Sequence, residues 1–290
     1  MIVSDKSRSS SERESGSEEA MKDDLFRELL EQFRRSPAGY RKVRTGVEKR
    51  IRRHMHRLGC EDVRAYLKRV AENPALSGHV EEMLTVSISR FFRDRAVWKE
   101  LAESVLPQLV PSAGPEMRVW SAGCALGQEA YSFRILWAQF SRTRTGVPGL
   151  ALWATDSNPA YLGKAMEGLY RSSVLRELPE ALRREHFRDV GDGRQVRVID
   201  RLKEGIFWRL HDFTREPPPH RAFQIVFLRN NLLTYYRKDV QEAVLPVILE
   251  ALTPGGVLII GKEEKLPPVP RRLTPVASNT PIYRIEAFPS

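Results

Sequence analysis

The stretch Trp120-Ser-Ala-Gly-Cys-Ala-Leu-Gly-Gln-Glu-Ala-Tyr-Ser132 decides the fold. It follows a short apolar run at residues 117–120 and leads into a segment with helical spacing. Gly123 and Gly127 allow the backbone between strand and helix to pass close to a ligand. In open α/β sheets, ligands bind at such loops beyond the carboxyl ends of the strands. The glycines alone are weak evidence, because a tight strand-to-helix turn has the same pattern.

The region after residue 115 alternates between short apolar runs and helical segments. The runs lie at residues 117–120, 150–154, 223–228 and 257–260. This alternation predicts an α/β domain over residues 116–290 with a doubly wound, Rossmann-like parallel sheet. Between the second and third runs, a Gly-Asp-Gly turn at residues 191–193 separates two alternating segments. It predicts a small antiparallel β insertion at residues 184–210.

The region before residue 111 has a different pattern. Residues 1–20 are rich in Ser, Glu, Lys and Arg with few apolar side chains, so we expect a disordered tail. Residues 21–110 repeat apolar positions at helical spacing and predict an all-α N-terminal domain. The turn formers at residues 111–115 mark the expected domain boundary.

Positive charge is concentrated in one helical segment at residues 40–57. The chain carries 47 Lys and Arg against 37 Asp and Glu, a formal net charge of +10. The segment has one strongly basic face, which is either a solvated surface or a docking surface. Its apolar positions recur at helical spacing: Val43, Val47, Ile51, Met55 and Leu58. Charge alone does not choose among nucleic acid, an anionic membrane and an acidic protein as partner.

Several classes of protein are disfavoured by composition. No apolar run reaches about 18 residues and no secretory signal begins the chain, so we expect a cytoplasmic protein without membrane insertion. Cys60 and Cys124 have no metal-ligand spacing, and we expect neither a metal site nor a disulfide. The chain lacks a basic motif interleaved with aromatic residues, so we expect no nucleic-acid partner.

Asp156 follows the second apolar run, at residues 150–154, where the predicted strand ends. It is a candidate ligand-binding residue. A carboxylate there is placed to accept hydrogen bonds from ribose hydroxyls. It follows the glycines by more than the roughly 20 residues of the dinucleotide fingerprint, which disfavours a dehydrogenase. The alternative role for Asp156 is to cap the helix that starts near Pro159.

Five blocks of the sequence, taken in order, resemble the CheR family of chemotaxis receptor methyltransferases. The family's Asn-x-Thr-x-Phe-Phe-Arg is similar to Ser87-Ile-Ser-Arg-Phe-Phe-Arg-Asp94, and its cofactor loop is similar to residues 120–132. Its Ala-Thr-Asp-Ile-Asp resembles Ala154-Thr-Asp-Ser-Asn158, and its Cys-Arg-Asn-Val block resembles Leu228-Arg-Asn-Asn-Leu-Leu-Thr-Tyr-Tyr236. A Pro-Gly-Gly block matches residues 252–261. The resemblance implies a class I methyltransferase sheet that binds S-adenosylmethionine.

The resemblance also implies roles for individual residues. Ser87, Ser89 and Arg93 would approach the methionine end of the cofactor, where Glu129 would lie beside its amino acid moiety. Asp156 would hold the ribose, and Asp212 and Phe213 would contact the adenine. The remaining implied cofactor-binding residues are Gly123, Arg229 and Asn230. Arg93 and Tyr235 are the candidate catalytic residues, with Tyr235 near the transferred methyl group.

The sequence departs from the family pattern at several positions. Ser87 stands for Asn, Gln128 for an acidic residue and Ala130 for Pro. One extra residue follows Asn230, and residues 262–266 differ from the family's His-Ser-Glu. A carboxylate remains in the loop at Glu129, so these changes affect the expected acceptor more than the cofactor.

Three functions follow from the sequence. The first is methyl transfer to glutamate side chains of chemoreceptors, whose acidic cytoplasmic helices would dock on the basic helix around Arg44, Arg52 and Arg53. The β insertion then resembles the family's receptor-tethering subdomain. The second is methyl transfer to another protein or a small acid. The third is a non-catalytic module that senses the cofactor or binds nucleic acid.

Overall fold

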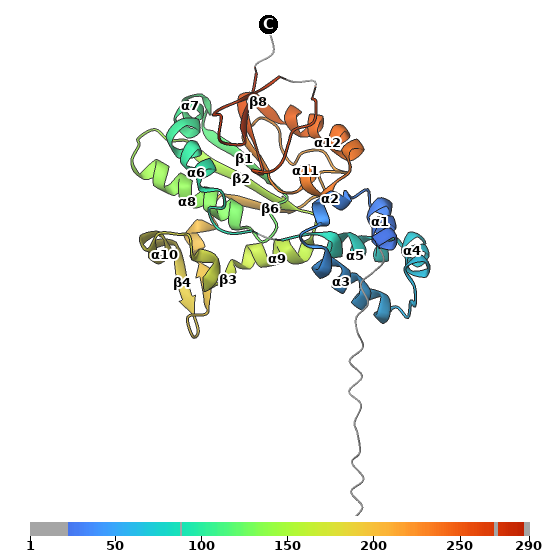
Figure 1. Cartoon of the computed structure of the whole chain (residues 1–290). Helices are drawn as coiled ribbons and strands as arrows, with labels where there is room; N and C mark the ends of the chain where they lie inside the picture. Colours follow the sequence, from blue (N-terminus) through green and yellow to red (C-terminus); the bar gives the residue numbers. More distant parts are fainter. Residues whose placement is uncertain (1–22, 88, 270–271, 287–290) are drawn as a thin grey trace, which may run out of the picture.

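The computed structural model describes residues 23–87, 89–269 and 272–286 (Figure 1). The tail predicted at residues 1–20 lies outside these ranges. The N-terminal helices are α1 (Asp23–Gln32), α2 (Pro37–Tyr40), α3 (Arg44–Arg57), α4 (Val63–Ala71) and α5 (Pro74–Leu84). Side chains cap two of them: Asp62 accepts from the Ala65 amide at the start of α4, and Asn73 accepts from the Ala75 amide at the start of α5.

The N-terminal helices share one apolar core. Its fully buried members include Leu29, Leu30, Val47, Ile51, Tyr66, Val70 and Val80. This core ends with Leu84, whereas the sequence predicted an all-α domain up to residue 110. The helices α6 (Arg95–Glu100) and α7 (Leu106–Leu109), joined by the π-helical turn Leu101–Val105, pack on the sheet instead. Trp98 stacks on Phe227 of the sheet with ring centroids 5.7 Å apart, which shows why these helices belong to the second domain.

The second domain contains the predicted doubly wound α/β sheet, with a mixed edge. Its strands are β1 (Glu116–Ala122), β2 (Gly149–Asp156), β6 (Ile206–Leu210), β7 (Phe223–Leu228), β8 (Leu252–Ile260), β9 (Leu273–Pro275) and β10 (Ile282–Ile285). Their order is β6-β2-β1-β7-β8-β10-β9. The first five run parallel, and β10 is antiparallel to both β8 and β9. The strand order reverses between β1 and β7, which is where such sheets bind ligands.

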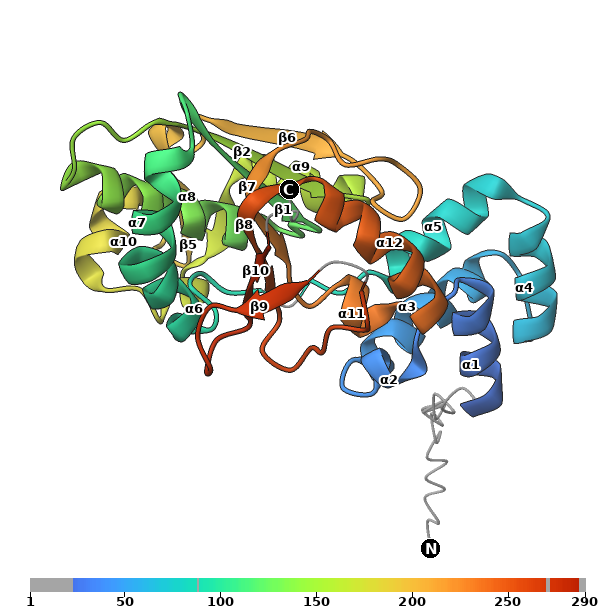
Figure 2. The same ribbon diagram turned by 90° about the horizontal axis from the view of Figure 1, so that it is seen from above.

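Helices cover both faces of this sheet (Figure 2). On one face, α6, α7 and α8 (Gln128–Arg142) contribute to a core that includes Phe133, Val119 and Ile225. On the other face, α11 (Leu232–Tyr235) and α12 (Lys238–Glu250) pack through Leu232 and Leu245. The central strand β7 is buried at every position, as expected of a strand covered on both sides.

A second sheet has three antiparallel strands in the order β3-β5-β4. They are β3 (Leu169–Arg171), β4 (Phe187–Val190) and β5 (Gln195–Val198). The β4–β5 turn contains Gly191 and Gly193, both at positive φ, so the Gly-Asp-Gly segment makes the hairpin turn. The expected insertion at residues 184–210 differs from the structure in one respect: Ile206–Leu210 is not part of it. That segment is β6, which pairs in parallel with β2 at the edge of the main sheet.

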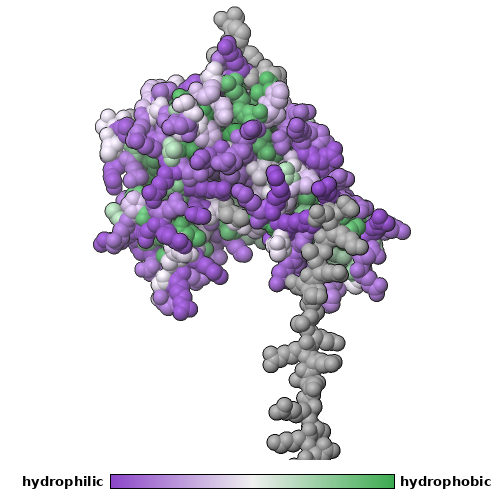
Figure 3. Space-filling model, in the orientation of Figure 1, coloured by the Kyte–Doolittle hydropathy of each residue, from purple (hydrophilic) through white to green (hydrophobic). Residues whose placement is uncertain are grey.

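The small sheet and the helical domain project from the same side of the main sheet. Helix α9 (Pro159–Glu167) lies between them (Figure 1), and α10 (Glu180–His186) belongs to the small-sheet part. Figure 3 shows a mostly hydrophilic face with an indentation between the two projecting parts. The small sheet is attached through Phe91, whose ring lies edge-on to those of Phe187 and Tyr170.

Candidate functional site

The glycine loop lies where β1 ends, at the reversal of strand order. The amides of Gly123 and Cys124 both donate to the Thr155 carbonyl, each at 2.8 Å, which ties the loop to the end of β2. Gly123 has φ +81°, and a Cβ atom there would lie 1.9 Å from Nδ2 of Asn231. Glycine is therefore required at this position both for its backbone angle and for space.

Asp156 lies beside this loop at the end of β2. One carboxylate oxygen accepts the Ala125 amide at 2.8 Å, and the other accepts the Asn158 amide at 2.9 Å. Burial raises the pKa of the Asp156 carboxyl, while these two amides oppose the rise. The helix-capping alternative for Asp156 does not hold, because the α9 cap is Asn158, which accepts from the amides of Ala160 and Tyr161.

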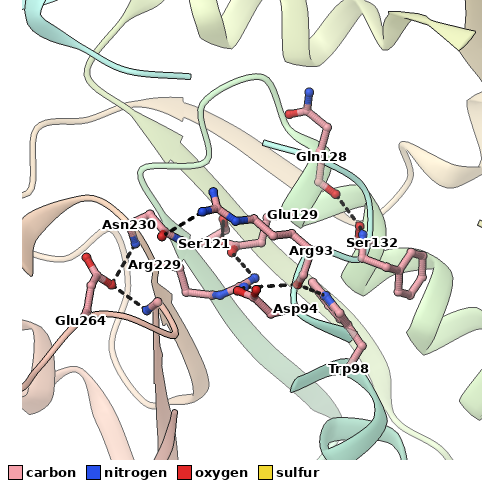
Figure 4. A network of polar contacts seen from close by, with 12 residues as sticks. Arg93, Asp94, Trp98, Ser121, Gln128, Glu129, Ser132, Arg229, Asn230 and Glu264 are labelled. Atoms are coloured by element: carbon pink, nitrogen blue, oxygen red, sulfur yellow. Dashed lines mark hydrogen bonds and ion pairs between the residues drawn. The ribbon is translucent and has the colours of Figure 1, made fainter. Parts of the chain in front are cut away.

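Glu129 and Arg229 form the centre of a buried ion network (Figure 4). Arg229, at the end of β7, contacts Glu129 at 3.2 Å with one nitrogen and Asp94 with another. The Ser121 hydroxyl also donates to Glu129 at 2.7 Å. Burial raises the pKa of Glu129, and the neighbouring Arg229 opposes this rise. The network holds strand β1, strand β7 and the segment before α6 together beneath the loop.

Arg93 and Asn230 extend the network toward the C-terminal part (Figure 4). The Arg93 guanidinium donates to Oδ1 of Asn230 at 3.3 Å. Asn230 has φ +53°, and its backbone amide donates to the Glu264 carboxylate at 2.9 Å. Glu264 also accepts from the Gly261 amide and the Thr234 hydroxyl. Residues 262–266 differ in sequence from the family's His-Ser-Glu. They nevertheless provide a carboxylate, Glu264, that fixes the turn after β7.

A single cavity collects nearly all of the predicted site residues. Its lining includes Ser89, Arg93, Gly123, Glu129, Asp156, Asp212, Phe213, Arg229, Asn230 and Tyr235. Ser87 is the one predicted cofactor residue outside this lining. Asp212 lines the cavity but accepts both the amide and the hydroxyl of Thr214, so part of its hydrogen-bonding capacity is used locally.

Sequence reasoning missed several further residues that line the cavity, among them Asn231, Tyr161 and Arg35. Asn231 follows the extra residue noted after Asn230, and its amide packs over Gly123. Tyr161 donates to the Thr85 carbonyl at 3.3 Å. Arg35 is 7% exposed, its guanidinium lies 3.7 Å from the centre of the Tyr236 ring, and its Nε has no hydrogen-bond partner. An orphaned buried donor at the wall of a cavity is a feature that a polar ligand can satisfy.

Tyr235 is held in the cavity by the helical domain. Its ring lies edge-on to the Tyr40 ring at 5.1 Å, and its carbonyl accepts the Ser36 amide at 2.9 Å. Burial raises the pKa of Tyr235 above its ordinary value of 10.0. The phenol is therefore protonated near neutral pH, so it is a hydrogen-bond donor rather than a base.

The basic helix is α3, and its cations differ in exposure. Arg44 and Arg52, two of the predicted docking residues, are partly buried and lie 2.6 Å and 4.0 Å from the buried carboxylate of Glu48. Arg53, the third, is exposed. Lys49 and Arg57 are exposed at four-residue spacing from Arg53, so these three share one helix face.

Comparison with protein families identifies the chain. The model described as "CheR methyltransferase, SAM binding domain" matches residues 87–282, which is more than half of the sequence. The chain belongs to the CheR methyltransferase family. Like its family, this CheR-type chain is a methyltransferase that uses S-adenosylmethionine. The matched region contains the cavity lining described above except for Arg35, Leu84, Thr85 and Val86.

Relatives agree with this assignment. The CheR-family chain is 31% identical over 201 residues to a chemotaxis protein methyltransferase of Listeria monocytogenes, covering 69% of this chain and 74% of the relative. It is 32% identical over 187 residues to chemotaxis protein methyltransferase 1 of Vibrio cholerae, covering 64% and 67%. It is also 30% identical over 222 residues to an uncharacterised 104.1 kDa protein of Rhodobacter capsulatus, covering 76% of this chain and 23% of that protein.

Two further properties concern the described residues only. Among them, no helix of the CheR-family chain combines the length and apolar character that crossing a membrane requires. In the same ranges, no group of three or more His, Cys, Asp or Glu side chains is arranged to hold a metal ion.

Proposed function

We propose that this protein transfers a methyl group from S-adenosylmethionine to a glutamate side chain in the cytoplasmic region of a chemoreceptor, giving a glutamyl methyl ester. The observation that carries the proposal is the single cavity in which Asp156 and Glu129 lie together with Arg93 and Tyr235. It combines carboxylates suited to the cofactor with a cation and a phenol suited to a carboxylate acceptor.

The carboxylates of Asp156 and Glu129 would bind different parts of the cofactor. Asp156 is positioned by two backbone amides and would accept hydrogen bonds from ribose hydroxyls. Glu129 would face the amino group of the methionine moiety while Arg229 keeps the carboxylate in place. Phe213 packs near Tyr236 and would cover one side of the adenine. When bound, the cofactor supplies an electrophilic methyl group on a positively charged sulfur.

The acceptor glutamate needs no general base. Its ordinary pKa of about 4.3 leaves it ionised at neutral pH. A carboxylate oxygen forms the new bond to the methyl carbon while the carbon–sulfur bond breaks, its electron pair stays on sulfur, and no proton moves. Arg93 would orient the carboxylate, and the protonated Tyr235 would shape the surroundings of the methyl group. Catalysis then rests on orientation and exclusion of water.

The test is transfer of radiolabelled methyl from S-adenosylmethionine to a soluble cytoplasmic fragment of a chemoreceptor. Label that is released by mild base identifies a glutamyl ester and supports the proposal. Base-stable label, or label on a small acid alone, would assign the chain to a different acceptor. No label on any of these acceptors, with cofactor binding intact, would point to a cofactor-sensing module.

Two variants test the roles of the cavity residues. Tyr235→Phe should lower kcat about tenfold, the effect of one hydrogen bond of about 1.4 kcal/mol, with S-adenosylhomocysteine affinity preserved. Arg93→Ala should lower kcat/KM for the acceptor more strongly. Tyr283→Phe, on strand β10 and outside the cavity lining, is the matched control. Unchanged rates for Tyr235→Phe and Arg93→Ala would remove these assignments.

Receptor docking is assigned to the basic face of α3. Receptor cytoplasmic helices carry the glutamates to be methylated, and an acidic surface complements Lys49, Arg53 and Arg57. The reaction therefore takes place in the cytoplasm. The small sheet is the candidate binding site for a receptor tail peptide. Because β4 and β5 have only four residues each, they offer a short strand edge for pairing with such a peptide.

A further inference from the structure

A second cationic site adjoins the cavity. It is a surface pocket lined by Arg90, Arg93, Asp94, Arg95 and Glu177, which defines the arginine pocket. Arg90 and Arg93 also line the cofactor cavity, so the two spaces adjoin each other at these side chains. Asp94 is already paired with Arg229. The pocket therefore lies beside the proposed methyl-transfer site, and the exposed side chains of Arg90 and Arg95 form its solvent side.

One carboxylate of the protein, that of Glu177, is paired with the arginines of this pocket. Glu177, between β3 and α10, accepts from Arg90 at 3.0 Å, and its second oxygen lies 4.0 Å from Nε of Arg95. The side chains of Arg90 and Arg95 are 66% and 70% exposed, and that of Glu177 is 34% exposed. Exposed ion pairs of this kind contribute little to stability, so exchanging Glu177 for another carboxylate costs little.

Arg95 keeps a second contact when the Glu177 carboxylate leaves. Arg95 also donates to the backbone carbonyl of Glu177 at 2.7 Å, a bond that does not depend on the side chain. The adjacent Leu178 is 3% exposed and anchors that backbone in the core. A pre-oriented guanidinium loses less entropy when it binds a carboxylate than a freely rotating one.

We propose that the arginine pocket binds an acidic side chain of the acceptor protein next to the glutamate that is methylated, and that Glu177 is the internal carboxylate which this side chain replaces. This inference rests on the function proposed above and adds a specificity determinant to it. Acceptors with a second carboxylate near the methylated one are preferred, because they satisfy Arg90 and Arg95 at the moment that the acceptor glutamate reaches Arg93.

The decisive variant is Glu177→Gln, which keeps the side-chain size and the backbone carbonyl but removes the competing charge. With a soluble chemoreceptor fragment as acceptor at low salt, KM should fall about threefold or more with kcat unchanged. Arg90→Gln should raise KM about fivefold. Both effects should disappear at high salt and on a fragment whose carboxylates flanking the methylated glutamate are changed to glutamine.

The matched control is Glu185→Gln. Glu185 is equally exposed and forms an ion pair with Arg142 at 3.5 Å on the same part of the chain, outside the arginine pocket. S-adenosylhomocysteine affinity, measured by calorimetry, verifies that each variant keeps its cofactor site. A KM for Glu177→Gln equal to that of wild type or of Glu185→Gln overturns the inference. If the wild type gives no base-labile label, the proposed function fails instead.

Discussion

Arg229 shows how single residues hold the site together. Its guanidinium is buried between Glu129 and Asp94, and it also donates to the Arg93 carbonyl at 3.2 Å. Buried side chains remain charged only when they have partners of opposite charge. Removing one partner leaves the others uncompensated in the protein interior, which solvates charge poorly. The same side chain thus supports the stability of the domain and the position of Glu129 in the cavity.

Arg229→Met is expected to lower the free energy of unfolding by about 3 kcal/mol, because the largely buried Glu129 and the partly exposed Asp94 lose their cation. Urea denaturation monitored by circular dichroism measures this. Arg184→Met is the control, since Arg184 pairs with Glu180 at the surface with both side chains more than 70% exposed. It should change stability by less than about 0.5 kcal/mol. Equal effects of the two substitutions would contradict a central role for Arg229.

The buried carboxyl of Asp156 gives cofactor binding a pH dependence. Burial raises its pKa above the ordinary 3.8, so the proton is taken up at a higher pH than for an exposed aspartate. Ribose hydroxyls donate more strongly to the ionised carboxylate than to the protonated carboxyl. Affinity for S-adenosylhomocysteine should therefore fall as the pH is lowered, and binding should release protons in mildly acidic buffer.

Calorimetry between about pH 8 and about pH 5, in buffers of different ionisation enthalpy, measures both quantities. Asp156→Asn should weaken binding at every pH and reduce its pH dependence, with Glu129 responsible for the remainder because burial raises its pKa in the same direction. Affinity that stays constant down to mildly acidic pH in the wild type would show that Asp156 does not hold the cofactor in its ionised form.

At the scale of elements, the sequence predicts what local periodicity determines. The runs that became β1, β2, β7 and β8 are apolar along their length because both faces of the sheet are covered, and the glycine loop follows from the same pattern. Three elements were placed wrongly. Strand β6 exposes Phe207 and Leu210 at an edge, so its pattern resembles that of a small hairpin. The sequences of α6 and α7 correctly predict helices. The spacing of their apolar residues does not, however, indicate which of the two hydrophobic cores they pack into.

The contact between α2 and α11 is a second property of elements that local patterns do not predict. A Cβ atom at Gly39 would lie 2.1 Å from the Thr234 carbonyl oxygen, so the two short helices touch through backbone. The neighbouring residues of this contact, Tyr40 and Tyr235, place the phenol in the cavity. The helical domain therefore completes the site by docking at one glycine.

Gly39→Ala should separate these helices, lower the free energy of unfolding by about 1–3 kcal/mol and reduce methyl transfer by displacing Tyr235. Gly46→Ala is the matched control: it lies in α3 with nothing within 4 Å of the added Cβ atom, and it should stabilise the protein by up to about 1 kcal/mol. Urea denaturation and the transfer assay measure both. Full activity and stability of Gly39→Ala would show that the contact is dispensable.

At the scale of the whole molecule, the cavity gathers residues from three distant parts of the sequence. Arg35 comes from the helical domain, Tyr161 from α9 and Asn231 from the turn after β7. Arg35 reaches the cavity only where the helical domain packs against the second domain, and the local patterns around Tyr161 and Asn231 do not mark a ligand site, so sequence reasoning missed all three. Most of the residues that it found lie in blocks that follow the strands, where chain order brings their side chains to one edge of the sheet. Ser87, Ser89 and Arg93, between α5 and α6, were found through the family resemblance.

The net charge of +10 is also a property of the whole molecule, and its distribution decides which residues contact a partner. The exposed face of α3 carries Lys49, Arg53 and Arg57, whereas Arg44 and Arg52 are partly neutralised by Glu48. Substitution of the exposed cations should therefore affect docking more than substitution of the two paired ones.

Arg53→Glu should weaken binding to a soluble chemoreceptor fragment several-fold at low salt, because an attraction between exposed charges becomes a repulsion. The loss should shrink as ionic strength rises and the Debye length shortens. Lys99→Glu makes the same charge change at a 72% exposed position on α6 and separates docking from the net charge. Calorimetric titration of both variants measures the difference. If the two lose affinity equally, the partner responds to the overall charge of the molecule and α3 is not its docking surface.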